Sequence, residues 1–330
     1  MMVRKLIQSS LLAVLMAFVV VGCNENPSDP GVDGGVTGLS ATSMSETSVG
    51  LSWNAFSGAT SYDVSWAPSS GGTGSSGSAS AVTTSATAMG LAPRTEYTFT
   101  VTPRTATGVG AASTIKWAGA TRSTSPSNPV SGTTTIRLYE ANSTNPSALN
   151  LSLNGSPLLT TLNPNAPAPA AKAQIGMFID PRTGGNPTKI VIGPVYAIPE
   201  YKLSAGLDIN RIDTSVYISG TTYQITSLDT WYLSAPLSTL IDPVSNVKAY
   251  EFTSASVASN QGFVVRTGSS AATYHYARVM VKSMSGSILG GTFPNRYIEL
   301  EISYQEGVNL PYAKPGMRPA AEGVRATVIQ

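Results

Sequence analysis

Residues 91–101 read LAPRTEYTFTV, and this stretch decides the fold of the first part of the chain. Tyr97, Phe99 and Val101 alternate with polar neighbours, so they predict a strand that buries one face. Two earlier segments share the alternation, with Val49, Leu51 and Trp53 in one and Tyr62, Val64 and Trp66 in the other. Short strands of this kind, at regular spacing and with turn residues between them, predict a sandwich of two sheets.

Several positions in this region match a known family. Residues 48–53 correspond to the family's second strand, which ends in a core tryptophan, and residues 59–64 correspond to its third strand. Leu91 and Tyr97 match its leucine and its tyrosine corner. On these positions, residues 36–122 resemble a fibronectin type III domain. The resemblance implies an immunoglobulin-like sandwich in which the tyrosine hydroxyl bonds back to the backbone. It implies no single function, because such sandwiches serve as spacers, adhesion modules and accessory domains.

The start of the chain has the layout of an exported segment. Arg4 and Lys5 precede an apolar block at residues 11–21, which at about 11 residues is too short for the ~20-residue helix that spans a bilayer. Cys23 follows this block and is the chain's single cysteine. The segment resembles a bacterial lipoprotein signal. That resemblance implies that residues 1–22 are a removed signal peptide and that the Cys23 thiol is acylated, with palmitate or a similar chain. A membrane-spanning anchor is the alternative.

Residues 23–35 are rich in Asn, Pro, Asp and Gly and predict a flexible tether. Asn24 follows the cysteine, where some bacteria use aspartate to keep lipoproteins in the inner membrane. The lipoprotein resemblance therefore implies a place in the bacterial cell envelope, in the outer membrane, on its periplasmic or its exposed side.

Charge and cysteine content narrow the classes of partner. The chain has 20 Lys plus Arg and 18 Asp plus Glu, and residues 1–22 hold two of the basic residues and no acidic one, which leaves 18 of each sign. A neutral chain without a Lys/Arg cluster offers little to phosphate backbones, so nucleic acid is not an expected partner. One cysteine permits no disulfide and no cysteine-based metal site.

The rest of the chain predicts a second domain made of strands. Residues 123–131 are rich in Ser, Pro, Asn and Thr and predict a linker. Residues 132–311 carry short apolar runs with turn residues between them, such as 296–304, where apolar and charged residues alternate. We expect a larger, mainly antiparallel β domain here, with one helical turn at residues 237–241 and a loose tail at residues 312–330. The whole chain is then all-β.

Three segments of the second region are similar to the closing strands of HmuY-like haem-binding lipoproteins, namely residues 262–268, 274–284 and 297–304. Those proteins are also acylated at a single cysteine, and they carry lysine where this chain has Arg278. The resemblance implies haem or small-ligand binding as an alternative function.

Haem iron takes histidine or methionine as axial ligands. The candidates are His275, Met280 and Met284, with Met177 elsewhere in the region. His275 is the chain's single histidine, and on an alternating strand it has the opposite parity to Met280 and Met284. An ordinary packing histidine and core methionines are the competing interpretation.

Asp229, Trp231 and Tyr232 form the densest aromatic and polar cluster of the second region. If they are exposed, the two rings offer a stacking platform for a sugar or a protein, with Asp229 available to a hydroxyl. If Trp231 is buried, it is a core anchor, which we favour because tryptophan is highly buried on average. Trp66 and Trp117 are open to the same two interpretations. A carbohydrate-binding accessory protein is therefore a further alternative.

The sequence predicts no enzyme. One histidine and one acylated cysteine cannot supply a nucleophilic triad or a hydrolytic zinc site. Asp208 with Asp213, or Glu299 with Glu301, could pair as glycosidase carboxylates, but a solvated turn or strand face explains them. We expect a non-enzymatic protein of surface binding or adhesion, attached to the membrane through its lipid, with a protein or glycan as ligand. We expect no metal, and no cofactor unless haem binds.

Overall fold

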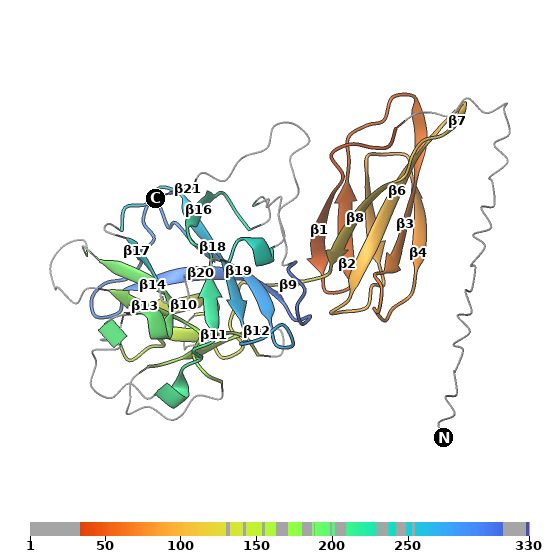
Figure 1. Ribbon diagram of the computed structural model, residues 1–330. Coiled ribbons are helices and arrows are strands. Elements are labelled where there is room, and N and C mark those ends of the chain that lie inside the picture. Colours follow the sequence, from red (N-terminus) through yellow and green to blue (C-terminus); the bar gives the residue numbers. More distant parts are fainter. Residues whose placement is uncertain are drawn as a thin grey trace, which may run out of the picture.

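The structure is a computed structural model (Figure 1). It describes residues 34–129, 133–140, 143–153, 156–162, 171–179, 187, 189–198, 200–201, 209–228, 231, 237–241, 249–252, 255–312 and 328–329. Cys23, Asp229 and Tyr232 lie outside the described residues, as do the predicted signal and most of the predicted tether. In the described part the chain is all-β, and its named strands pair antiparallel, which confirms the predicted fold class.

The first sandwich, drawn in orange and yellow in Figure 1, packs two sheets together. One sheet has the order β1-β2-β5, with the bounds Ser40–Ser45, Ser48–Ser52 and Ser85–Met89. The other has the order β4-β3-β6-β7, with the bounds Gly77–Ala81, Ala59–Pro68, Glu96–Thr105 and Gly108–Val109, and β8 (Ser113–Ala118) also pairs with β6.

Alternate residues of these strands form the core of the first sandwich. The rings of Trp53 and Tyr62 meet edge to face with centroids 5.3 Å apart. Tyr97 and Phe99 are fully buried, and burying a side chain of this size stabilises a fold by about 1.5–3 kcal/mol. The backbone N–H of Ala92 donates to Tyr97 Oη at 2.9 Å. The tyrosine corner that the family resemblance implies is therefore present.

The second domain also has two sheets. The larger has the order β10-β20-β19-β18-β16-β21, with the bounds Ile136–Tyr139, Tyr297–Gln305, His275–Val281, Asn260–Thr267, Thr222–Ile225 and Val328–Ile329. In the same sheet β15 (Val216–Ile218) pairs with β18, and β9 (Thr121–Ser123) pairs with β20. The smaller has the order β12-β11-β13-β14-β17, with the bounds Ser156–Thr160, Ala148–Leu153, Ile175–Ile179, Ile190–Pro194 and Tyr250–Phe252.

The inner faces of the two sheets share one core. It contains Leu300 and Ile302 of β20, Phe263 of β18, and Leu149 and Met177 from the smaller sheet. The outer face of the larger sheet is covered in part by a second apolar cluster, built around Leu228, Trp231, Leu237, Ile241, Val264 and Met280. A third cluster, with Val191, Val195, Ile198, Tyr201 and Ile212, covers the outer face of the smaller sheet.

Helix is sparse in the described part of the chain. Three short 3-10 helices occur there, η1 (Val195–Ala197), η2 (Ile209–Arg211) and η3 (Leu237–Thr239). The last confirms the helical turn expected at residues 237–241. None of the helices in the described ranges has the length and apolar content that crossing a membrane requires.

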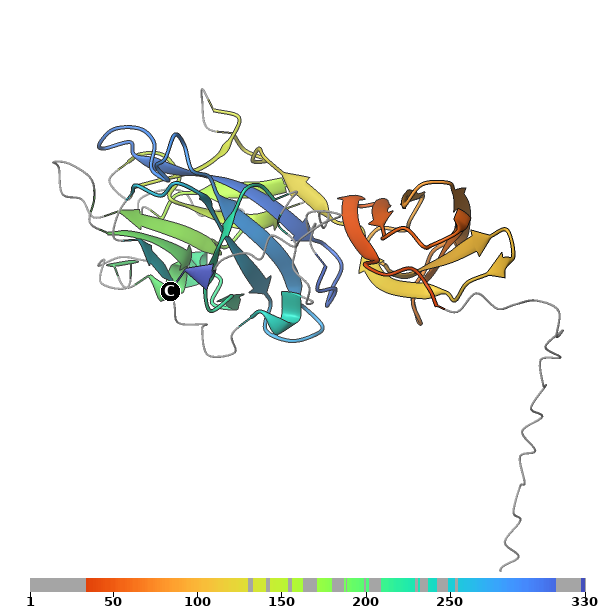
Figure 2. The same ribbon diagram turned by 90° about the horizontal axis from the view of Figure 1, so that it is seen from above.

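β9 joins the first sandwich to the second domain, and both views place the two side by side at this strand (Figures 1 and 2). Thr121 pairs with Tyr304, its Oγ1 donates to Tyr304 O, and Ser303 Oγ donates to Thr121 O, both at 3.0 Å. From the sequence, residues 121–122 are assigned to the first sandwich and residue 123 to a linker, whereas backbone pairing attaches all three to the second domain's sheet. Pairing between strands distant in the chain carries no local signal.

Side chains on both sides reinforce this connection. The ring of Tyr312 lies 4.8 Å from that of Trp117, and its hydroxyl donates to Glu96 Oε2 at 2.9 Å. Arg94 pairs with Glu306 at 2.6 Å. Burial and the neighbouring Glu96 raise the pKa of Tyr312, so its hydroxyl remains a donor. We call these contacts, together with the β9–β20 pairing, the joint.

Candidate functional site

The outer face of the larger sheet carries several charged and aromatic side chains among the described residues of the second domain. Three groups lie on it. The polar network contains Arg137, Lys282, Glu299 and Glu301, with Thr133 and Thr135 beside them. The tryptophan cluster contains Trp231 and Arg278. The arginine stack contains Arg266, Tyr217 and Tyr274.

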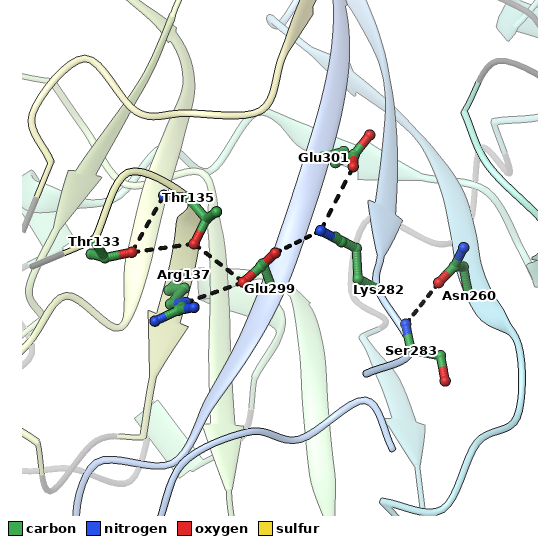
Figure 3. A network of polar contacts seen from close by, with 8 residues as sticks. All are labelled: Thr133, Thr135, Arg137, Asn260, Lys282, Ser283, Glu299 and Glu301. Carbon is green, nitrogen blue, oxygen red and sulfur yellow. Dashed lines mark hydrogen bonds and ion pairs between the residues drawn. The ribbon is translucent and has the colours of Figure 1, made fainter. Parts of the chain in front are cut away.

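The polar network crosses three strands (Figure 3). Strand register places Arg137 of β10 opposite Glu299 of β20, and Arg137 Nε lies 3.1 Å from Glu299 Oε2. Lys282, just after β19, bonds to Glu299 Oε1 at 2.7 Å and lies 3.8 Å from Glu301 Oε1. Thr135 Oγ1 donates to Glu299 Oε2 at 3.2 Å. Two cations therefore balance two carboxylates.

The charge state of Glu299 argues against acid catalysis at this network. Burial alone would raise its pKa, but hydrogen bonds from Lys282 and Arg137 outweigh burial and hold the pKa below its usual value. A glycosidase needs one carboxyl with a raised pKa as its general acid. The pKa of Glu299 is lowered instead. Its ion pairs with Arg137 and Lys282 connect β10, β20 and the end of β19, which is a structural role. Asp208, of the other carboxylate pair, lies outside the described residues.

The tryptophan cluster is a packed unit. Trp231 is 2% exposed, as the packing interpretation expects, so its ring does not face solvent. Arg278 is fully buried on β19, donates to the carbonyl oxygens of Trp231 at 2.6 Å and of Leu228 at 3.4 Å, and lies 5.1 Å from the Trp231 ring. Gly262 lies beneath that ring, and a Cβ there would come within 2.9 Å of it. Arg278 thus holds the covering segment on the sheet.

The structure does not bring the histidine and methionine candidates together. His275 stacks on Tyr304 with ring centroids 5.8 Å apart, and its Nδ1 lies 3.3 Å from Gln305 O. Met280 points to the other face of β19 and is buried in the tryptophan cluster. Met284 lies in the turn after β19, where its N–H donates to Ser287 O at 2.6 Å. Met177 is in the shared core between the sheets.

The two tryptophans of the first sandwich are both half-buried. Trp66 packs at the edge of the core, across Gly77, where a Cβ would lie 2.5 Å from its ring. Trp117 donates from Nε1 to Ser43 Oγ at 2.9 Å and stacks on Tyr312 in the joint. Neither residue stands clear of the protein as a flat platform.

Sequence reasoning missed the arginine stack. Arg266 on β18 has its guanidinium carbon 4.2 Å from the ring centroids of both Tyr217 and Tyr274. Tyr217 lies 49 residues before Arg266 and Tyr274 lies 8 residues after it. The pairing of β15 and β19 with β18 brings the three side chains together. Alternation within each strand could assign each side chain to a face, and nothing in the sequence fixes the register.

Metal ligation is not indicated in the described ranges, where no group of three or more His, Cys, Asp or Glu side chains could hold an ion.

Comparison with known proteins identifies the first sandwich. Residues 34–116 match the fibronectin type III domain. The solution structure of the fn3 domain of human collagen alpha-1(XX) chain is 27% identical, covers 31% of this chain and 95% of that chain, and gives a TM-score of 0.26. The crystal structure of the FN3 domain of human collagen XX is 29% identical, covers 26% of this chain and 96% of that chain, and gives a TM-score of 0.23.

A third similar structure is the FN1–FN3 region of chicken CNTN1, which is 19% identical, covers 27% of this chain and gives a TM-score of 0.24. This chain spans 31% of that structure. No curated protein matches the chain. The chain thus contains a fibronectin type III domain before its second domain. Such domains are typically binding or scaffold modules without catalytic activity, which suggests a role in binding or adhesion.

Proposed function

We propose that the protein is a non-enzymatic binding lipoprotein of the bacterial envelope. Lipid on Cys23 attaches it to the outer membrane, and residues 23–35 form the predicted tether. The fibronectin type III domain acts as a spacer, and the second domain presents the surface that binds a protein or a glycan outside the cell.

The joint is the observation that carries this proposal. A spacer positions a binding domain only if the two do not swivel freely. Here a strand of the connection pairs with β20, and Tyr312 and Arg94 add an aromatic stack and an ion pair. Loss of relative motion lowers the entropy cost of engaging a ligand held at a fixed distance from the membrane. A fixed joint therefore supports presentation better than a free linker does.

The other functions considered from the sequence draw less support from the described contacts. His275 and Met280 lie on opposite faces of one strand, so they do not form the opposed axial pair that a haem clamp needs. Trp231 is buried, so it does not offer a sugar-stacking face.

The anchor is tested by mass spectrometry of the full chain made in a bacterial host that processes lipoproteins. We expect a mature protein that begins at an acylated Cys23, and membrane fractions that lose it in the Cys23→Ser variant. An intact initiator methionine with an unmodified thiol would overturn the anchor.

The binding role is tested separately on whole cells. Cells that carry the protein should adhere to surfaces coated with extracellular glycans or proteins more strongly than cells that carry Cys23→Ser. The binding proposal fails if adhesion is equal across all coatings while the wild-type protein is present on the outer membrane.

A further inference from the structure

Arg266 lacks the carboxylate partner that four other described arginines have. Carboxylates pair with Arg94, Arg104, Arg137 and Arg296. Arg266 instead contacts two tyrosine rings, and in the part of the chain that the structure describes its guanidinium makes no hydrogen bond or ion pair. Its Nε is buried and has no partner. A half-buried cation without a counter-charge is costly, because burial removes water without replacing it.

The strands fix this guanidinium from both sides. Register places Tyr217 of β15 opposite Arg266 and Tyr276 of β19 opposite it on the other side. Tyr274 lies just before β19, two residues ahead of Tyr276, and its ring packs in the same apolar cluster on the outer face. The guanidinium carbon lies 4.2 Å from the centroids of both the Tyr217 and Tyr274 rings, so two cation–π contacts fix the position of this planar group.

Three tyrosines lie next to Arg266, two by ring contact and one by strand register. No hydrogen bond within the described residues engages the hydroxyls of Tyr217, Tyr274 or Tyr276, although all three flank Arg266 in the sheet. Burial raises the pKa of Tyr276, so that hydroxyl stays protonated and can donate. One planar cation with neighbouring O–H donors is the donor set that recognises an oxyanion.

We propose that Arg266, with Tyr217, Tyr274 and Tyr276, binds the carboxylate of an acidic polysaccharide. The inference rests on the proposed binding function and names its ligand class. A carboxylate matches the guanidinium fork with two parallel hydrogen bonds and carries the single negative charge that one cation neutralises, whereas phosphate carries up to two. Tyrosine rings also suit the apolar C–H face of a sugar.

The polar network contains an arginine that contacts both a tyrosine ring and a carboxylate within the protein. The guanidinium of Arg137 also lies 4.2 Å from a tyrosine ring, that of Tyr297, and its Nε bonds to Glu299. Arg266 repeats the stacking without the internal carboxylate. A uronic acid residue would supply that carboxylate from outside, and a polymer of such residues would engage several protein copies on one cell surface.

The test is calorimetric titration of the detergent-solubilised full chain with oligogalacturonate. We expect saturable binding that falls about tenfold or more in Arg266→Gln and less in Tyr217→Phe, which keeps the ring and loses the hydroxyl. Arg104→Gln removes the same charge from an exposed pair in the first sandwich and should bind within about twofold of wild type. Circular dichroism and Tm establish that each variant is folded.

Three results would overturn the site. These are absence of oligogalacturonate binding by the wild-type chain, equal binding by Arg266→Gln, and equal binding of the methyl-esterified oligomer, which has no free carboxylate. Tighter, Arg266-dependent binding of a Glu-rich peptide would reassign the carboxylate to a protein and refute the polysaccharide. If cells carrying Arg266→Gln still adhere as the wild type does, this site fails and the proposed function stands.

Discussion

The ion pair between Glu140 and Arg296 closes one end of the larger sheet of the second domain. Glu140 follows β10, Arg296 precedes β20, and their side chains are 1% and 8% exposed. Glu140 Oε1 accepts from the backbone N–H and from Nε of Arg296 at 2.9 and 3.0 Å, and Oε2 accepts from Nη2 at 2.6 Å. The Glu140 N–H donates in return to Arg296 O at 3.0 Å.

Replacing Glu140 by Gln keeps the shape of the side chain and removes its charge. Arg296 then loses the carboxylate it pairs with, and removing one partner of a buried pair costs about 3–5 kcal/mol. A glutamine oxygen at the Oε1 position still accepts two of the three bonds, so we expect a loss near the lower end, about 3 kcal/mol. That is a large share of the roughly 5–15 kcal/mol by which a domain is stable.

The assay is hydrogen exchange in increasing urea, followed by mass spectrometry of the β10 and β20 peptides, because these report on the second domain alone. The exposed pair Arg104–Asp63 of the first sandwich supplies the control, read in the same experiment from the β3 and β6 peptides, since its side chains are 47% and 46% exposed. Asp63→Asn should cost about 1 kcal/mol or less. The double variant Glu140→Met, Arg296→Met should regain much of the loss, because neither charge remains. A Glu140→Gln cost no larger than that of Asp63→Asn would refute the reasoning.

Three further predictions concern other parts of the molecule. Gly262→Ala places a Cβ 2.9 Å from the Trp231 ring, so overpacking should cost about 1–3 kcal/mol in urea unfolding, and an unchanged midpoint would contradict this packing. The pKa of Glu299 is lowered on folding, so its stabilisation is complete above the unfolded pKa of about 4.3 and is lost as pH falls through the folded value. Glu299→Gln should therefore flatten the acid limb of the stability profile, and a limb as steep as the wild type's would exclude this assignment. Tyr312→Ala should speed hydrogen exchange in β9 severalfold by removing the stack on Trp117, whereas Tyr312→Phe should retain most protection; equal rates in both variants would count against the stack.

The strands of the first sandwich could be predicted because their signal is local. Side chains alternate along a strand whatever it pairs with, so Tyr62 and Val64 or Tyr97 and Phe99 show their buried face in the sequence. The tyrosine corner adds a local signature, and the structure contains its bond from Ala92 to Tyr97. The expected helical turn was likewise local, and η3 confirms it.

The groups on the outer face of the second domain could not be predicted, because they depend on register. Arg278 reads in the sequence as one charged residue in an apolar strand, and only the segment that ends at Trp231 explains its burial. The joint depends on Tyr312, which lies where composition predicts a loose tail. In each case the partner is distant in the chain, so no window of local sequence contains both members.

Stability alone does not explain why an arginine occupies position 266. On the same face, Arg137 pairs with Glu299 and Arg278 donates to two carbonyl oxygens, so the fold can supply internal acceptors to a buried guanidinium. Arg266 receives only the stacking energy of two rings, about 0.5–2 kcal/mol each, against the desolvation of its Nε. An apolar residue would pack between Tyr217 and Tyr274 without that cost. Real proteins break such local rules at functional sites. A carboxylate from another molecule would supply the partner that this guanidinium does not find among the described residues.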